Sequence, residues 1–240
     1  MPSQQRSVLM AQQERAVRTR NALIESAAEL FSKDGFDVVS LSTISTRAGV
    51  SNGALHFHFA SKAALTAAVW EAAAQRLRQI THEGAARGQA AGSGGPLQVL
   101  VDTTHALLRG LRHDVILRAG FDLSESPVPV PGADLRRRWQ AWVESLLVQA
   151  AREGALARDV APQDAAHAVV AATVGFGALG SRNAQWLSQS MLTRFWALLL
   201  PRLAAETTLK ELVASGRRRE GTAPPEAVSP LHRAVSRQSA

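Results

Sequence analysis

The side chains best suited to chemistry gather in one stretch, Leu41 to Phe59, which reads LSTISTRAGVSNGALHFHF. Within it, Asn52, Gly53 and His56 occupy positions i, i+1 and i+4 of an expected short helix, so they share one face. Asparagine and histidine carry donors and acceptors that can pair with the edges of bases. Such a face is suited to entering the major groove of DNA.

The residues around this face predict the helices that must position it. Ser40 is expected to cap a helix from Leu41 to Ala48, and Gly49 to end that helix in the left-handed conformation. Ser51 is expected to cap the second helix. The apolar residues that would pack the two helices together are Ile44, Ala48, Val50 and Leu55. The pattern predicts a helix-turn-helix.

Acidic residues are absent from Val38 to Trp70, where the average composition would place roughly two to three. Three helix starts fall in this interval, at Ser40, Ser51 and Ser61, and first turns normally favour acids. A phosphate bound to the backbone N–H groups at these helix starts would take the place of the missing acids, because a helix N-terminus stabilises an anion. The alternative is that an alanine-rich stretch lacks acids by chance.

The composition of the 240 residues favours an anionic partner, because the net charge is +7 and the isoelectric point is about 11.2. Part of that charge belongs to a Pro/Ser/Ala-rich tail that holds Arg217, Arg218, Arg219, Arg233 and Arg237. The absence of cysteine excludes disulfides and thiolate catalysis. No signal peptide and no apolar run near the ~20 residues of a membrane span is evident, so we expect a cytoplasmic protein with no membrane partner.

The chain lacks a period-2 segment of useful length and therefore predicts an all-α fold of nine or ten helices. We expect a flexible arm (1–13), a three-helix helix-turn-helix DNA-binding domain (14–62), a helical ligand-binding and dimerisation domain (63–207) and a disordered basic tail (208–240). The expected helices outside the motif are Glu14–Ser32, one from Ser61 to about Ile80, Leu97–Leu111, Val115–Leu123, Leu135–Arg152, Pro162–Leu179 and Ala184–Ala205. Gly84–Pro96 and the proline-rich Ser124–Gly132 are expected to be loops.

The helix that begins near Pro162 carries small residues on nearly every side, and the final helix carries large apolar ones. Small side chains allow another helix to approach closely, so this pair is expected to form an isologous four-helix interface in a homodimer. The alternative is that both helices are buried within one monomer.

Several motifs resemble the DNA-binding domain of TetR-family transcriptional repressors over about residues 15 to 70. They are Phe31–Gly35, Leu41–Ile44, Ala48–Phe59 and Ser61–Lys62 with Leu65. Further on, Val115–Phe121, Pro127–Val130 and Trp139 resemble the γ-butyrolactone autoregulator receptors, a branch that controls antibiotic production. The resemblance implies an Ω-shaped homodimer, a palindromic double-stranded DNA operator and a small-molecule inducer.

The resemblance also implies roles for individual residues of the DNA-binding domain. It places Asn52, Gly53 and Ala54 on a recognition helix, Ser51 to Phe57, nearest the bases. The expected contacts with the DNA backbone are Arg20, Ser42, Thr43, Ser51, His56 and Lys62. For the arginines of the first helix, a solvated basic face is the alternative. Asn52 stands where the receptors carry Lys, and the operator is expected to differ at that position because Asn prefers adenine and Lys prefers guanine. His56 stands where the family usually has a phosphate-contacting Tyr; it keeps a donor and adds a titratable group.

In the second domain the resemblance implies that Trp139 lines the ligand pocket and that Thr173 offers a hydroxyl there. Trp142 is expected to replace Trp139 in this role or to lie beside it. His105, Arg109 and Gln149 are candidates for fixing a lactone or a furan carboxylate. The alternative is that both tryptophans are ordinary core residues. Ligand near Trp139 would favour a conformation in which the helix from Ser61 swings and the DNA-binding heads no longer match the spacing of successive major grooves.

Two other classes of function compete with this interpretation. An enzyme is disfavoured because His56 and His58, two apart on a helix, point in opposite directions and cannot share a metal, and the remaining histidines are scattered. We therefore expect that the protein is not an enzyme and has neither a metal site nor a cofactor. The second competing class is a helical scaffold protein that does not bind DNA. Within the family, the alternatives are a regulator of drug efflux or lipid metabolism with a different apolar ligand, and a pseudo-receptor.

Overall fold

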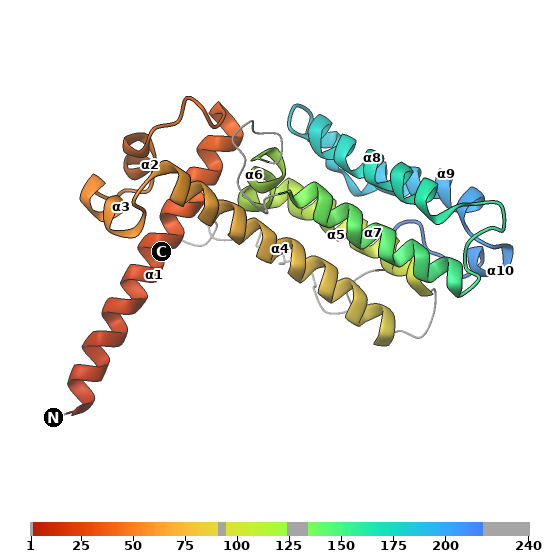
Figure 1. The fold of residues 1–240 in the computed structure, drawn as a ribbon, viewed down its shortest axis with the longest axis horizontal. Helices are drawn as coiled ribbons and strands as arrows, with labels where there is room; N and C mark the ends of the chain where they lie inside the picture. Colours follow the sequence, from red (N-terminus) through yellow and green to blue (C-terminus); the bar gives the residue numbers. More distant parts are fainter. Residues whose placement is uncertain (1, 91–94, 124–133, 218–240) are drawn as a thin grey trace, which may run out of the picture.

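The computed structural model describes residues 2–90, 95–123 and 134–217, and Figure 1 shows that these form an assembly of helices. The α-helices are α1 (Pro2–Asp34), α2 (Leu41–Arg47), α3 (Asn52–His58), α4 (Lys62–Ala90), α5 (Gly95–His113), α6 (Val115–Leu123), α7 (Leu135–Arg152), α8 (Pro162–Gly180), α9 (Gln189–Leu203) and α10 (Glu206–Leu209), with a 3₁₀ helix η1 (Ala184–Leu187) before α9. Across the described ranges, β pairing is limited to one isolated bridge between Leu156 and Ala204, so the all-α prediction is confirmed. None of the described helices is both long enough and apolar enough to cross a lipid bilayer.

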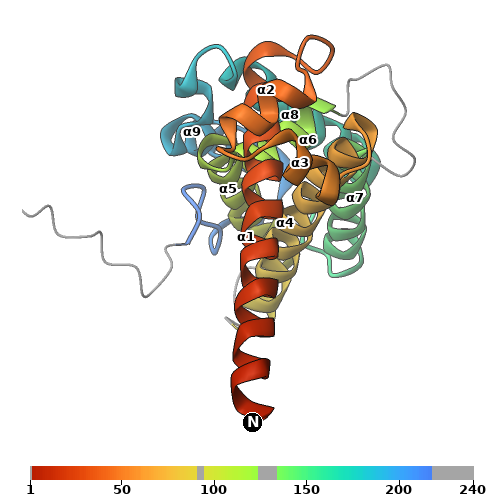
Figure 2. The ribbon, with the colours of Figure 1, turned by 90° about the vertical axis from the view of Figure 1, so that its left-hand side faces the viewer.

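Helix α1 is longer than expected, because residues 2–13, expected to be a flexible arm, form its first turns. Pro2 suits a first turn, and the residues after it include good helix formers and no glycine. This first half of α1 stands away from the other helices (Figures 1 and 2), whereas the second half buries Leu23, Ala27 and Phe31 in the core.

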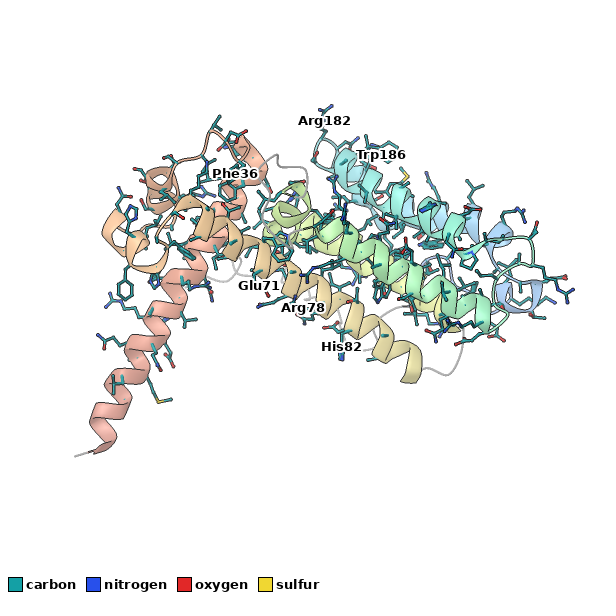
Figure 3. The ribbon with its side chains drawn as sticks, in the orientation of Figure 1. Phe36, Glu71, Arg78, His82, Arg182 and Trp186 are labelled. Atoms are coloured by element: carbon teal, nitrogen blue, oxygen red, sulfur yellow. The ribbon has the colours of Figure 1, made fainter. Side chains whose placement is uncertain are left out.

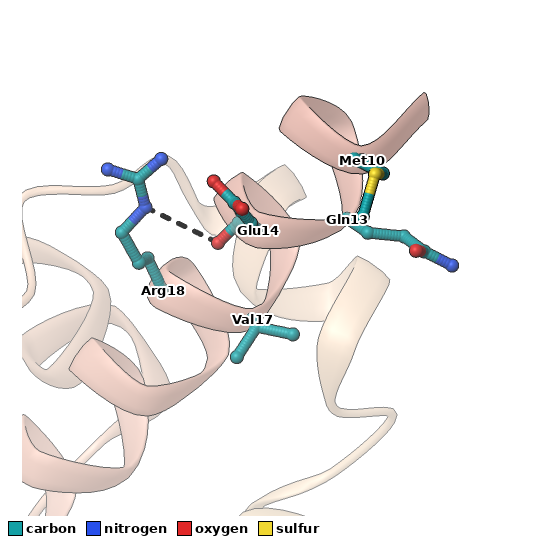
Figure 4. A pocket seen from close by; sticks show the side chains of 5 residues that line it. All are labelled: Met10, Gln13, Glu14, Val17 and Arg18. Carbon is teal, nitrogen blue, oxygen red and sulfur yellow. Dashed lines mark hydrogen bonds between the residues drawn. The ribbon is translucent and has the colours of Figure 1, made fainter. Parts of the chain in front are cut away.

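The projecting part of α1 exposes one mixed face, formed by Met10, Gln13, Glu14, Val17 and Arg18 (Figure 4). Met10 and Val17 are exposed, and Arg18 Nε donates to the Glu14 carbonyl at 3.4 Å. These residues come from a single helix, so they cannot by themselves enclose a ligand.

Helix α4 continues to Ala90, so the predicted loop is wrong for residues 84–90. Gly84 and Gly88 lie one turn apart and face α5. A Cβ at Gly84 would lie 2.1 Å from Thr103 Oγ1, and a Cβ at Gly88 would lie 2.1 Å from Val99 Cγ2. These glycines serve close packing of α4 on α5 rather than a turn.

Helix α6 is packed between the N-terminal helices and the rest of the protein. A Cβ at its Gly120 would lie 2.3 Å from Ala73 Cβ of α4 and 2.7 Å from Leu135 Cδ1 of α7. Asp114 caps α6 by accepting from the N–H groups of Ile116 and Leu117 at 3.0 and 3.1 Å, and it pairs with Arg76 of α4. The helix therefore joins the DNA-binding candidate region to the second domain.

The predicted bounds of the helix from Leu135 to Arg152 are confirmed by α7. The last predicted helix is instead divided into η1 and α9, because Ser188 caps α9 by accepting from Met191 N at 3.3 Å. Leu187 of η1 packs directly on Gly180, where a Cβ would lie 2.4 Å from Leu187 Cγ. The predicted loop from Ser124 to Gly132 lies outside the described residues.

The segment that follows α10 is also ordered up to Arg217, although we expected disorder from residue 208. Its backbone is held by side chains of α5: Val213 N–H donates to Gln98 Oε1, and Arg217 N–H donates to Asp102 Oδ1, both at 2.8 Å. These partners lie more than a hundred positions earlier, so the composition of the tail gives no signal of them. The expected tail beyond Arg217 lies outside the described residues.

Candidate nucleic-acid interface and ligand site

The helix-turn-helix forms as its turn chemistry predicts. Ser40 Oγ accepts from Thr43 N and Ser51 Oγ accepts from Ala54 N, each at 3.1 Å, and both serines are N-caps. Gly49 has φ +67° and closes the turn, with Val50 N–H donating to the Ser45 carbonyl at 3.0 Å. Ser61 caps α4 in the same way, by accepting from Ala64 N.

Helix α3 exposes the face that the sequence predicts. Asn52, Gly53 and His56 are exposed and Ala54 is half-buried, while Leu55 is fully buried against the rest of the domain. Ser51 and Ser61 at the two helix starts are exposed as well. In the described protein, this face of α3 and the N-termini of α3 and α4 are therefore exposed.

Two residues that we did not single out from the sequence also shape this site, one on its surface and one beneath it. Phe57 of α3 is 83% exposed, which is unusual for a phenylalanine and offers an apolar contact beside His56. Ser45 is buried, and its hydroxyl lies in hydrogen-bond contact with the Asn52 side chain and 2.9 Å from the Ser42 carbonyl. This contact holds the Asn52 side chain in one orientation at the start of α3.

The candidate backbone-binding residues surround this face without forming one cluster. Ser42 and Thr43 are exposed on α2, and the Thr43 and Ser40 hydroxyls lie 2.7 Å apart. Arg20 is exposed on α1, with its guanidinium 5.2 Å from the centre of the Phe59 ring.

Lys62 is engaged within the domain. Its Nζ donates to the carbonyl oxygen of Phe36, lies 3.4 Å from that of Asp37, and stands 4.3 Å from the centre of the Phe36 ring. The lysine therefore ties the start of α4 to the end of α1, a role that the sequence did not indicate.

Two acids near the interface, Glu71 and Glu29, are paired with arginines. The first acid after the acid-free interval, Glu71 on α4, pairs with Arg78 at 2.8 Å (Figure 3). Hydrogen bonding from Arg78 lowers the pKa of Glu71, so this carboxylate stays ionised and paired. Glu29 on α1 is likewise paired with Arg47 at 2.6 Å.

In the second domain the structure brings together three of the ligand candidates. Trp139 is fully buried, and its Nε1 donates to Thr173 Oγ1 at 2.8 Å. Trp142 stacks on Trp139 with ring centres 5.1 Å apart and an interplanar angle of 22°. Thr173 in turn donates to the Val169 carbonyl at 2.9 Å, so this polar group is satisfied within an apolar core.

The other three ligand candidates lie elsewhere. His105 Nε2 lies 3.0 Å from the carbonyl oxygen of Ala214, and Gln149 is exposed and bonded to Glu153. Arg109 is exposed on α5, beside His105 in a separate cavity. Among the described contacts, none of the three reaches Trp139.

Lowering the pH is expected to destabilise the protein through His105. Burial lowers the pKa of His105 and the nearby Arg109 adds to this, whereas the Ala214 carbonyl and Asp102 act in the opposite direction. The unfolded chain then binds this proton more readily, so the free energy of unfolding falls as the pH drops below the ordinary value of 6.5. We expect the free energy of unfolding, measured with urea at about pH 7.5 and about pH 5.5, to differ less between the two pH values for His105→Gln than for the wild type. Equal differences would contradict the assignment.

Comparison with known proteins identifies relatives that cover most of the chain. Residues 23–69 match the bacterial regulatory proteins of the tetR family. The A-factor receptor protein of Streptomyces griseus is 28% identical over 212 residues, which cover 87% of this chain and 72% of that protein.

Two solved structures extend the likeness to the whole fold. A γ-butyrolactone receptor described as ArpA-like has a TM-score of 0.70 and 30% sequence identity, and the match covers 81% of this chain and 92% of that one. CprB from Streptomyces coelicolor, solved in complex with its operator sequence, has a TM-score of 0.69 and 29% identity, with 82% and 93% covered.

Proposed function

The chain belongs to the TetR family of bacterial regulatory proteins, in its autoregulator receptor branch, and we propose that it is a ligand-responsive repressor that binds a palindromic operator as a homodimer. The observation that carries this proposal is the open face of α3, where Asn52, Gly53 and His56 are exposed beside uncovered helix N-termini. A small signalling molecule of the γ-butyrolactone, butenolide or furan type releases it from DNA. The genes it controls serve secondary metabolism, and it acts in the cytoplasm.

DNA binding begins with α3 in the major groove. Asn52, oriented by Ser45, pairs with a base edge, and Gly53 and Ala54 allow the helix to approach closely. Phe57 supplies an apolar contact for a thymine methyl group or a sugar. The exposed starts of α3 and α4, at Ser51 and Ser61, bind phosphates, with Arg20, Ser42, Thr43, His56 and Lys62 around them.

Dimerisation uses the outer faces of α8 and α9, which expose apolar side chains. Leu198 of α9 is 82% exposed and Leu179 of α8 is 45% exposed, although both helices also contribute to the core. Two such faces related by a two-fold axis form an isologous four-helix interface. The recognition helices then lie about 34–36 Å apart, one turn of DNA.

Induction starts at the Trp139–Thr173 hydrogen bond, where a lactone or furan oxygen competes for the same donors. Arg138, the residue before Trp139 on α7, places its guanidinium 4.8 Å from the centre of the Trp70 ring on α4. A change around Trp139 is therefore transmitted to α4, which carries the DNA-binding head. The ligand stabilises the conformation in which the two heads no longer match successive grooves.

Fluorescence anisotropy with promoter-proximal DNA tests the proposal. We expect salt-sensitive binding to a palindrome, and we expect Asn52→Ala to weaken it by about 1–3 kcal/mol while binding to unrelated DNA stays unchanged. His82→Ala is the matched control, because His82 is exposed on α4 beyond the head (Figure 3). Failure to find any DNA bound more tightly than unrelated sequence would overturn the proposal.

A further inference from the structure

A cavity of about 230 Å³ lies between α5, η1 and the start of α9, apart from the Trp139–Thr173 pair. The described residues that line it are His105, Leu108, Arg109, Arg112, His113, Leu187, Ser188, Gln189 and Leu192. The α5 residues His105, Leu108, Arg109 and Arg112 are spaced i, i+3, i+4 and i+7, so they form one stripe that faces the cavity.

The charge of the cavity is positive. Arg109 and Arg112 both line it, and the described lining residues include no Asp or Glu. Neither arginine forms an ion pair with another described residue. Arg112 and His113 lie in the last turn of α5, where a cation is favoured by the helix dipole, but Arg109 lies one turn earlier and has no such explanation.

The carboxylates that flank the stripe on α5 are committed to other partners. Asp102 Oδ1 accepts from Gln98 Nε2 and from Arg217 N, both at 2.8 Å. Asp114 caps α6 and pairs with Arg76. Within residues 2–90, 95–123 and 134–217, the two guanidinium groups therefore have no carboxylate partner and can pair with an added anion.

The floor of the cavity is apolar. Leu108, Leu187 and Leu192 are all buried and face the same space. One wall is fixed by the C-terminal segment, because His105 contacts the carbonyl oxygen of Ala214, and Gln189 Nε2 donates to that of Ser215 at 3.3 Å. The cavity is smaller than the roughly 300–1,000 Å³ of pockets for drug-sized ligands, so its occupant is a small molecule.

We infer that this cavity binds a small amphipathic carboxylate, with the carboxylate on Arg109 and Arg112 and the apolar part on the leucine floor. Arginine suits this role because its planar guanidinium pairs with a carboxylate through two parallel hydrogen bonds. The site is separate from the one proposed for the inducer, and its existence does not depend on the regulatory function.

Isothermal titration with 4-phenylbutyrate and with its methyl ester tests the inference, because the two probes differ in charge and share their apolar part. The wild type is expected to bind the acid at least about tenfold more tightly than the ester. The double variant Arg109→Gln/Arg112→Gln is expected to lose at least about tenfold in affinity for the acid, and Arg109→Lys/Arg112→Lys to lose less.

Two controls locate the binding site. Arg194→Gln removes an exposed arginine of α9 that does not line the cavity, and Trp139→Phe alters the proposed inducer site; neither should change the affinity for the acid. Thermal unfolding checks that each variant is folded, and operator binding is measured in parallel so that a failure of the regulatory proposal is seen separately. The inference is overturned by equal binding of acid and ester, by wild-type affinity in the double glutamine variant, by loss of binding in Trp139→Phe, or by no binding of the acid to the wild type.

Discussion

A Leu198→Arg variant is expected to be monomeric and to bind the operator at least about 100-fold more weakly than the wild type. Leu198 is the most exposed large apolar residue of α9, and a two-fold interface would set each new cation against its own copy. A monomer engages one half of the palindrome only, so it loses the advantage of binding both halves at once. Light scattering after size exclusion measures the mass, and anisotropy measures the affinity.

The matched control is Leu9→Arg, which places the same charge on another exposed leucine, on the projecting part of α1. That variant should remain a dimer. A dimeric Leu198→Arg protein would show that α8 and α9 do not form the interface.

Trp139→Ala is expected to lower the free energy of unfolding by about 3–5 kcal/mol, because the side chain is fully buried and its removal leaves a cavity. The variant also loses the ring that stacks on Trp142 and the N–H that donates to Thr173. Chemical unfolding measures this loss. A loss of operator binding in Trp139→Ala would therefore report stability rather than induction.

Trp139→Phe separates the two effects. It keeps an aromatic ring in the core and removes the N–H, while Thr173 still donates to the Val169 carbonyl. We expect this variant to bind the operator normally and to need at least about tenfold more inducer for release, because one good hydrogen bond is lost. Thr173→Val removes the partner hydroxyl and should behave alike. An unchanged inducer requirement in both variants would place the inducer elsewhere.

The helix-turn-helix could be predicted from sequence because its signals are local. Ser40, Gly49 and Ser51 act within three or four residues of their own positions, through caps and one left-handed residue. The glycines of α4 show the opposite case. The sequence pattern predicts a loop from Gly84, and only the packing of Gly84 against Thr103 of α5 shows that this glycine serves close helix packing.

Sequence predicts only the part of the candidate site that depends on local signals. The contact between Ser45 and Asn52, and that between Lys62 and Phe36, depend on how helices pack, which no local pattern encodes. Phe57 could have been found from the sequence. It lies two residues from both buried Leu55 and buried Phe59, so helical periodicity places it on the side away from the core.

The close packing of the α4 glycines on α5 also determines how far the other end of α4 moves when the helix tilts. Gly84 presses this helix against α5, and Lys62 at its other end is 22 positions away, or about 33 Å along a straight helix. With the helix pivoting near Gly84, a tilt of about 6° displaces its start by roughly 3.4 Å, the rise of one base pair. In the induction that we propose, a small tilt of α4 would therefore shift the DNA-binding head by about one base-pair step along the duplex.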